Sequence, residues 1–275
     1  MADDEITKLE EGQPGRKSTD TSTSTAFCTS PEVVTLLQKV AAELLGTFFI
    51  IFAGCGAVAV NNHYGQVTFP GVCVTWGLIV MAMIYALGHI SGAHFNPAVT
   101  ITFALFRHFP YKHVPLYIVA QVVGSIMASG VLCLLLEIRP ADSFVSARSG
   151  SPVQALVMEI VVTFLFMFVI SGVCTDHRAV GELAGFVIGM TLLLNVFVAG
   201  PVSGASMNPA RSLGPAIVLN DYEGLWIYIV GPIVGAILGG GAYNLIRFTD
   251  KPLSELTKSS SFLKAGSSSR KASAG

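Results

Sequence analysis

Six long apolar runs constrain this chain more than any other feature of its sequence. An α-helix needs roughly 20 predominantly apolar residues to cross the hydrocarbon core of a bilayer. In lipid the backbone polar groups must pair within the segment, so runs of this kind cross as helices. The sequence therefore predicts an all-α protein embedded in a lipid bilayer, with spans at Leu37–Val60, Phe69–His89, Val114–Leu136, Gln154–Cys174, Leu183–Gly200 and Leu225–Ile246.

Composition argues against the main alternative, a large soluble protein with buried helices. Only 12% of the residues are charged, about half of the roughly 25% that is usual for soluble domains. A net charge of −1 gives no electrostatic basis for binding nucleic acid. The five cysteines lack CxxC spacing, so we expect neither a disulfide framework nor a metal site, and no cofactor.

The apolar runs divide the chain into three parts. Residues 1–36 are rich in Ser, Thr, Gly and charged side chains, and this predicts a disordered tail. Residues 37–247 form the membrane domain, with one repeat at about 37–136 and a second at about 154–247. Residues 248–275 are Ser-rich and basic toward their end, and they predict a second disordered tail.

One polar turn occurs twice, as SGAHFNPAVT at Ser91–Thr100 and SGASMNPARS at Ser203–Ser212. Asn is a favoured N-cap and Pro a favoured first helical residue. The boxes Asn96-Pro97-Ala98 and Asn208-Pro209-Ala210 thus each predict a helix start. The apolar segments that follow, Pro97–Phe106 and Pro209–Leu219, are about half as long as a membrane span needs, so we expect two re-entrant half-helices.

The two halves also share an acidic position, Glu43 in AAELLGTF and Glu159 in VMEIVVTF. Each half contains three spans, so the second half must lie inverted relative to the first. Inverted repeats bring their interrupted helices together near the bilayer midplane. Two positive helix ends, together with Arg211, would repel cations and protons there. The sequence predicts a pore for small uncharged solutes.

The distribution of Lys and Arg predicts the orientation. Arg107, Lys112, Arg178 and Arg247 fall on one side of a six-span arrangement, and both termini lie on that side, which is therefore expected to be cytoplasmic. Arg139 and Arg148 fall on the opposite side, but they are fewer than the basic residues on the predicted cytoplasmic side.

The chain resembles the major intrinsic proteins, the aquaporins and aquaglyceroporins, over about Lys39–Arg247. The resemblance rests on both Asn-Pro-Ala boxes and on the paired glutamates. Four segments are most similar to the plant nodulin-26-like intrinsic proteins: GHISGAHFNPAVT, NVFVAGPVSGASMNPARSLGPA, RFTDKPL and TKSSSFLK. The filter residues named in the next paragraph resemble those of the first subgroup of these proteins. The resemblance implies an aquaporin-like fold and a homotetramer with one pore per subunit. It also implies passage of water, glycerol, ammonia and neutral metalloid hydroxides.

The family's selectivity filter maps by motif position onto Trp76, Val196, Ala205 and Arg211. Water-selective relatives carry His where this chain has Val196, which leaves a wider and more apolar ring. A polyol could lay its carbon backbone on Trp76 while its hydroxyls reach the fixed donors of Arg211; small undissociated acids fit as well. Glycerol facilitators often place Asp after the filter arginine, where this chain has Ser212, so slower glycerol passage is expected.

Three further polar residues are interpreted as supports of the two polar turns. Glu43 and Glu159 are expected to accept hydrogen bonds from the strained backbone before each box, in preference to relaying protons. His94 is expected to hold the first turn and not to bind a metal.

The tail carries a candidate regulatory site. Lys258 stands three residues before Ser261, and the resemblance implies a calcium-dependent protein kinase site at Ser261. A plasma membrane location is expected from the family, with an internal membrane as the alternative.

Three other functions compete with a solute channel. A mainly water-selective channel would share the fold. A coupled secondary transporter would also use inverted repeats, but it needs a cation site that two helix N-termini and an arginine disfavour. A non-conducting adhesion protein would not require both boxes. An enzyme is not supported, because no paired nucleophile and base, phosphate loop or metal cluster is evident.

Overall fold

The computed structural model describes residues 30–137 and 142–247. The chain divides into two units, residues 1–38 and 39–275, and the packed helices belong to the second. The elements in chain order are α1 (Pro31–Tyr64), α2 (Thr68–Ser91), α3 (Pro97–Leu105), η1 (Tyr111–His113), α4 (Val114–Leu136), α5 (Pro152–Thr175), η3 (Gly181–Leu183), α6 (Ala184–Ser203), α7 (Pro209–Leu219) and α8 (Ile227–Ile246).

Six of the described helices are long and apolar enough to cross a membrane, which agrees with the predicted spans. The first differs most from its prediction, because α1 begins at Pro31, within the predicted disordered tail, and continues past Val60 to Tyr64. Apolar composition marks the part of a helix that lipid covers, whereas the helix itself can extend beyond it. α3 ends one residue before its predicted end at Phe106, and α8 begins two residues after Leu225.

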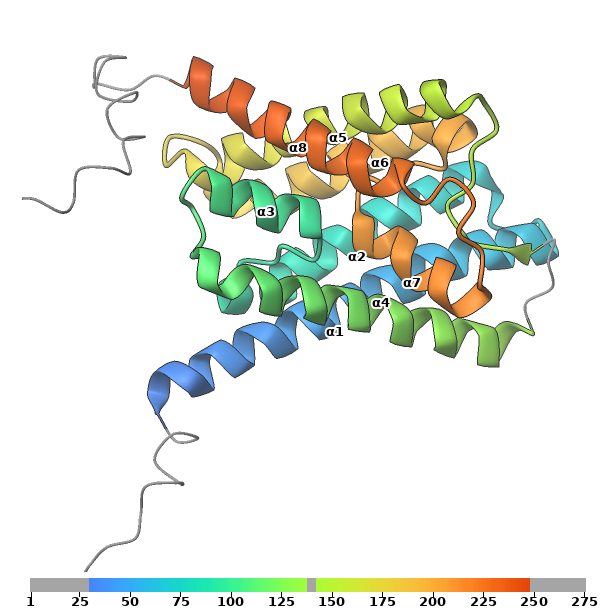
Figure 1. Ribbon diagram of the computed structural model, residues 1–275, viewed down its shortest axis with the longest axis horizontal. Coiled ribbons are helices and arrows are strands. Elements are labelled where there is room, and N and C mark those ends of the chain that lie inside the picture. Colours follow the sequence, from blue (N-terminus) through green and yellow to red (C-terminus); the bar gives the residue numbers. More distant parts are fainter. Residues whose placement is uncertain (1–29, 138–141, 248–275) are drawn as a thin grey trace, which may run out of the picture. The chain divides into compact units, whose positions relative to one another are not determined.

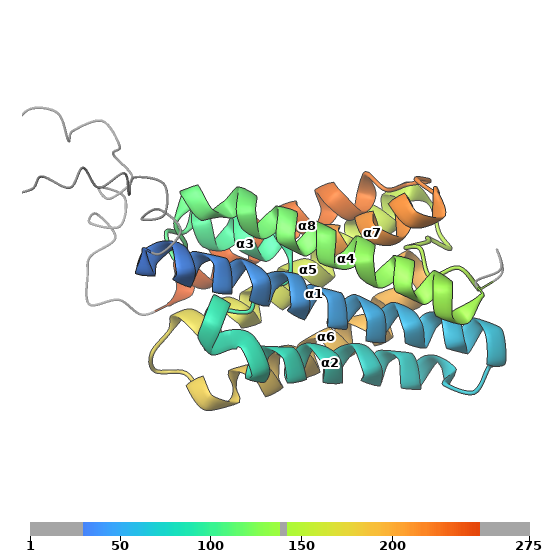
Figure 2. The ribbon, with the colours of Figure 1, turned by 90° about the horizontal axis from the view of Figure 1, so that it is seen from below.

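The helices form two related repeats, α1–α4 and α5–α8, which pack against each other through α2 with α6, α4 with α7, and α3 with α8. α2 lies against α6 and α5 lies against α8, as Figure 2 helps to follow. Glycines permit the closest approaches: a side chain at Gly124 would overlap the Leu44 carbonyl of α1, and one at Gly235 would overlap the Ile160 carbonyl of α5. The same contact therefore recurs in both repeats.

The two short helices complete the inverted repeat. α4 contacts both α3 and α7, and Figure 1 shows these two helices one beyond the other along it. They also contact each other. Their N-terminal turns therefore meet inside the helix bundle, which positions the site described next.

Candidate functional site: a cavity between two capped half-helices

Each short helix begins with an asparagine cap. Asn96 has extended backbone angles, and its Oδ1 accepts a hydrogen bond from the Ala98 N–H at 2.9 Å. Asn208 repeats this arrangement: its Oδ1 accepts from Ala210 N–H at 3.0 Å and from Arg211 N–H at 3.4 Å. Proline follows each cap at the first helical position, where its missing N–H costs nothing.

The same two asparagines tie the repeats to each other. Asn96 Nδ2 donates to the Met207 carbonyl at 2.8 Å, and Asn208 Nδ2 donates to the Phe95 carbonyl at 2.8 Å. An amide nitrogen carries two protons, so each asparagine keeps one further donor. Both residues line the cavity, where that donor is available to a solute.

The turns before the caps contain strained backbone at matching positions. Ala93 and Phe95 have φ angles of 51° and 49°, and their counterparts Ala205 and Met207 have 49° and 52°. Residues other than glycine rarely adopt positive φ, at a cost of order 1–3 kcal/mol each. Strain of this kind persists only where surrounding interactions hold it.

Glu43 supplies such interactions to the first turn from α1. Its Oε1 accepts from the His94 N–H at 3.0 Å and from the Ser91 hydroxyl at 2.7 Å. Its Oε2 accepts from the Phe95 N–H at 2.7 Å and from Gln121 Nε2 at 2.8 Å. The side chain is fully buried, so the carboxylate exchanges water for these four donors.

Glu159 of α5 holds the second turn in the same way. Its Oε1 accepts from the Ser203 hydroxyl at 2.7 Å and from the Ser206 N–H at 2.9 Å, and its Oε2 accepts from the Met207 N–H at 2.8 Å. It too is fully buried. Both glutamates thus contact the turns that the sequence assigned to them.

His94 lies inside the first turn. Its Nδ1 is 3.1 Å from the Thr100 hydroxyl, which donates its one proton to the Asn96 carbonyl and accepts from Gln121. The Thr100 oxygen can therefore only accept from the imidazole, which places the proton on Nδ1. The ring holds the turn through this bond and packs against Phe103 and Tyr117.

One cavity runs between the repeats and is lined by both turns. The four residues predicted as a filter all line it, and they are only 5% to 7% exposed. Their neighbours on the wall are mainly apolar side chains: Ile50, Val80, Ile84, Val99, Phe103, Phe166, Ile170, Ile188 and Leu192.

Arg211 supplies the charged group among the filter residues on this wall. Its guanidinium carbon lies 5.4 Å from the centroid of the Trp76 ring, within the range of a cation–π contact. Its Nη1 donates to the hydroxyl of Ser146, whereas its Nε has no partner among the described residues. Val196 and Ala205 add only apolar atoms, so the wall combines donors with apolar surface.

Several residues of the site were not found in the sequence. Gln121 and Tyr117 of α4 bond to Glu43 and to the Ser91 carbonyl. Gln121 did carry a signal, because a polar residue within a membrane span is a functional candidate. Ser146 lies in an irregular segment, and no pattern marked it.

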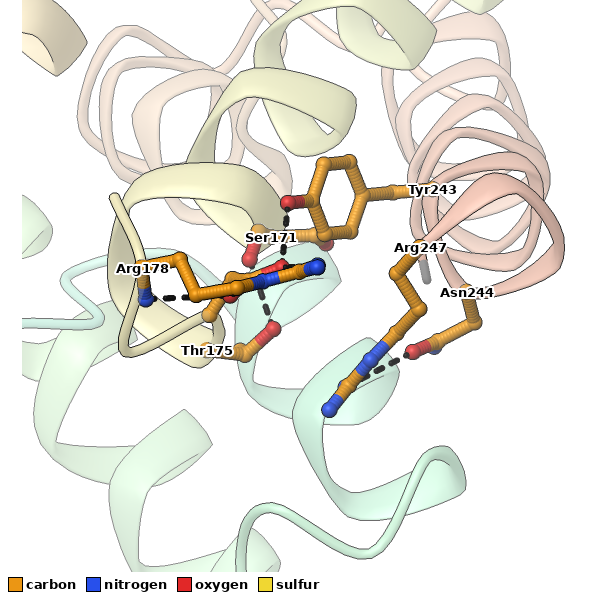
Figure 3. A network of polar contacts seen from close by, with 7 residues as sticks. Ser171, Thr175, Arg178, Tyr243, Asn244 and Arg247 are labelled. Carbon is orange, nitrogen blue, oxygen red and sulfur yellow. Dashed lines mark hydrogen bonds and ion pairs between the residues drawn. The ribbon is translucent and has the colours of Figure 1, made fainter. Parts of the chain in front are cut away.

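A second polar cluster lies where α5 ends (Figure 3). Asp176 accepts from Arg178 through Oδ1 at 2.9 Å and Oδ2 at 2.6 Å, and Tyr243 of α8 donates to Oδ2 at 3.1 Å. Hydrogen bonds from the Arg178 side chain and backbone hold the pKa of Asp176 below its usual value. The cluster fastens the segment after α5 to α8.

Comparison with known proteins agrees with this architecture. Residues 30–243 match the family described as Major intrinsic protein. The chain is 60% identical over 274 residues to the putative aquaporin NIP4-1 of Arabidopsis thaliana, covering 99% of this chain and 96% of that protein. It is 57% identical over 238 residues to nodulin-26 of Glycine max, covering 86% and 88% of the two chains.

A solved structure is similar as well. The X-ray structure of the aquaglyceroporin from Plasmodium falciparum superposes with a TM-score of 0.71 at 27% identity, over 77% of this chain and 96% of the other. The chain belongs to the major intrinsic protein family and is an integral, multi-pass membrane protein of the aquaporin fold. Members of this family are channels and not enzymes.

Proposed function

We propose that the protein is a passive channel for small uncharged solutes, and that it excludes ions and protons. The proposed solutes are glycerol, water and ammonia, together with neutral metalloid hydroxides or small undissociated acids. The observation that carries this proposal is the wall formed by Arg211 and Trp76 beside Val196 and Ala205. A polyol can exchange hydrogen bonds with the guanidinium while its carbons lie on the indole.

Ion exclusion follows from the charges at the centre of the cavity. The N-termini of α3 and α7 each carry a partial positive charge, and Arg211 adds a full one close by. Asn96 and Asn208 line the cavity and each keep one amide proton that can be donated to a neutral solute. A cation would have to give up its hydration for a site that repels it.

The test is stopped-flow light scattering on proteoliposomes that contain the purified protein. A glycerol gradient measures solute entry, and an impermeant osmolyte measures water flow. Glycerol entry well above that of protein-free vesicles supports the proposal. Fast water flow without glycerol entry would make this a mainly water-selective channel, and flux that requires an ion gradient would indicate a coupled transporter.

Further assignments accompany this function. We propose a homotetramer with one pore per subunit, a plasma membrane location and cytoplasmic termini. The proposed domain is residues 37–247, between an N-terminal tail and a regulatory tail at 248–275. The kinase site proposed at Ser261 lies outside the described residues. Cross-linking, membrane fractionation and phosphopeptide mapping of Ser261→Ala against the unmodified protein test these assignments.

A further inference from the structure

An irregular segment between α4 and α5 reaches the cavity wall at Arg211. Its serine at position 146 is only 3% exposed, and its hydroxyl accepts a hydrogen bond from Arg211 Nη1. The same segment is fixed a second time, because Ser149 N–H donates to the Val202 carbonyl at 3.1 Å. The segment is therefore held to α7 and to the end of α6, on the two sides of Ala147.

Three buried serine hydroxyls continue from this contact. Ser146 Oγ is 2.5 Å from Ser212 Oγ, and Ser212 Oγ is 2.6 Å from Ser206 Oγ. Ser206 Oγ is in turn 3.0 Å from the carbonyl oxygen of Asn208. Ser206 and Ser212 are 5% and 0% exposed, and Ser206 also lines the cavity, so the chain of hydroxyls is packed into the cavity wall.

The two ends of this chain fix the direction of every hydrogen bond. A guanidinium can only donate and a carbonyl can only accept, and each hydroxyl has one proton. Ser206 must therefore give its proton to Asn208, Ser212 to Ser206, and Ser146 to Ser212. Every proton is used, and hydrogen bonds aligned in one direction strengthen one another.

We infer that Ser146, Ser212 and Ser206 form a directed hydroxyl chain that positions the Arg211 guanidinium, and that Ser146 is a specificity-determining residue of the channel. The chain returns to Asn208, the residue that caps the helix carrying Arg211. It therefore couples the orientation of the filter arginine to the second Asn-Pro-Ala turn. This inference rests on the proposed passage of a polyol past Arg211.

Ser212 acquires a definite role in this arrangement. A carboxylate at this position could only accept protons, so it could not pass one on to Ser206. A hydroxyl both accepts and donates, and this completes the chain. The serine that follows the filter arginine thus replaces an ionic partner with a relay of neutral groups.

The first experiment compares glycerol and water permeabilities in proteoliposomes for the wild type, Ser146→Ala, Ser146→Thr and Ser212→Ala. Loss of the Ser146 hydroxyl frees Nη1, and the glycerol-to-water ratio is expected to fall about three- to tenfold, the range of one hydrogen bond. Ser146→Thr retains the hydroxyl and should retain the ratio. Ser212→Ala should give a smaller fall, because Arg211 keeps its first partner.

The matched control is Ser129→Ala. Ser129 is equally buried and donates to the Ser125 carbonyl within α4, away from the chain of hydroxyls. The Ser129→Ala variant should leave the glycerol-to-water permeability ratio unchanged. A Ser146→Ala protein with the wild-type ratio would overturn the inference.

A second readout does not depend on glycerol flux. In ¹⁵N-arginine spectra of the reconstituted protein, Arg211 is assigned by its loss in Arg211→Lys. Separate Nη1 and Nη2 signals are expected in the wild type and in Ser146→Thr, and exchange-averaged signals in Ser146→Ala. Equally separate signals in Ser146→Ala would refute the positioning role. Absence of glycerol flux in the wild type, with this pattern intact, would refute only the proposed function.

Discussion

The Arg211 guanidinium and the Trp76 indole lie on one cavity wall, with the guanidinium carbon 5.4 Å from the ring centroid. Together they place hydrogen-bond donors beside an aromatic surface on the cavity wall. The small side chains Val196 and Ala205 line the same cavity. The width and polarity of this region can therefore be changed one residue at a time.

Val196→His is expected to reduce glycerol permeability at least about tenfold, equivalent to about 1.4 kcal/mol in the barrier. Imidazole adds volume and a polar group to the apolar part of the wall. Water permeability should persist, since water is smaller. Stopped-flow measurements on both solutes check this. Val196→Thr, which adds a hydroxyl with little volume, serves as the control, and an equal loss there would assign the effect to polarity.

Glu159→Gln is expected to lower the free energy of unfolding by about 1.5–3 kcal/mol, the usual value of a hydrogen bond to a charged group. Glutamine replaces one carboxylate oxygen with an NH₂ group, which cannot accept a hydrogen bond. The bond from the Met207 N–H or from the Ser206 N–H is therefore lost. Thermal unfolding in detergent measures the change. Glu182→Gln, at an exposed position, should be neutral. Equal stability of the two variants would contradict the role assigned to Glu159.

Asn208→Asp is expected to admit protons or cations. The carboxylate can still cap α7, but it cannot donate to the Phe95 carbonyl, and it places a negative charge between the helix N-termini. A pH-sensitive dye inside proteoliposomes reports the leak. Asn62→Asp is the control, because Asn62 is exposed near the end of α1 and donates to the Ser143 carbonyl, away from the cavity-lining residues. A leak in both variants would indicate general damage.

Asp176→Asn is expected to destabilise the protein near neutral pH and to have less effect in acid. Hydrogen bonds from Arg178 lower the pKa of Asp176 from 3.8, so its contribution is complete above that value and is lost as the pH falls below it. Melting temperatures of the wild type and the variant at about pH 6 and about pH 3.5 test the sign. Asp221→Asn, in an exposed turn, provides the comparison. If the difference in melting temperature between the wild type and Asp176→Asn were larger in acid, the role assigned to the Asp176 carboxylate would be contradicted.

The spans and half-helices were predictable because their signals are local. An apolar run determines a membrane helix, and an asparagine followed by proline determines a helix start, whatever lies elsewhere. The inverted arrangement followed from the odd number of spans in each half. The roles of Asn96 and Asn208 as caps could likewise be read directly from their sequence.

The hydrogen bonds between segments that are far apart in the sequence could not be predicted in this way. Each asparagine donates to the opposite turn, and this depends on how two strained loops meet. Ser146 contacts Arg211 from a segment with no periodic pattern. Only three-dimensional packing brings that hydroxyl to the guanidinium, so composition and spacing gave no indication of it.

The reciprocal bonds of Asn96 and Asn208 also bear on how such a chain could have arisen. Each asparagine caps its own helix but donates an amide proton to a carbonyl of the opposite turn, so one half of the molecule cannot satisfy that donor by itself. An ancestor of half this length would have needed a second copy inserted in the opposite direction across the same membrane. Gene duplication and fusion would then have made permanent a pairing that previously depended on two molecules meeting head to head.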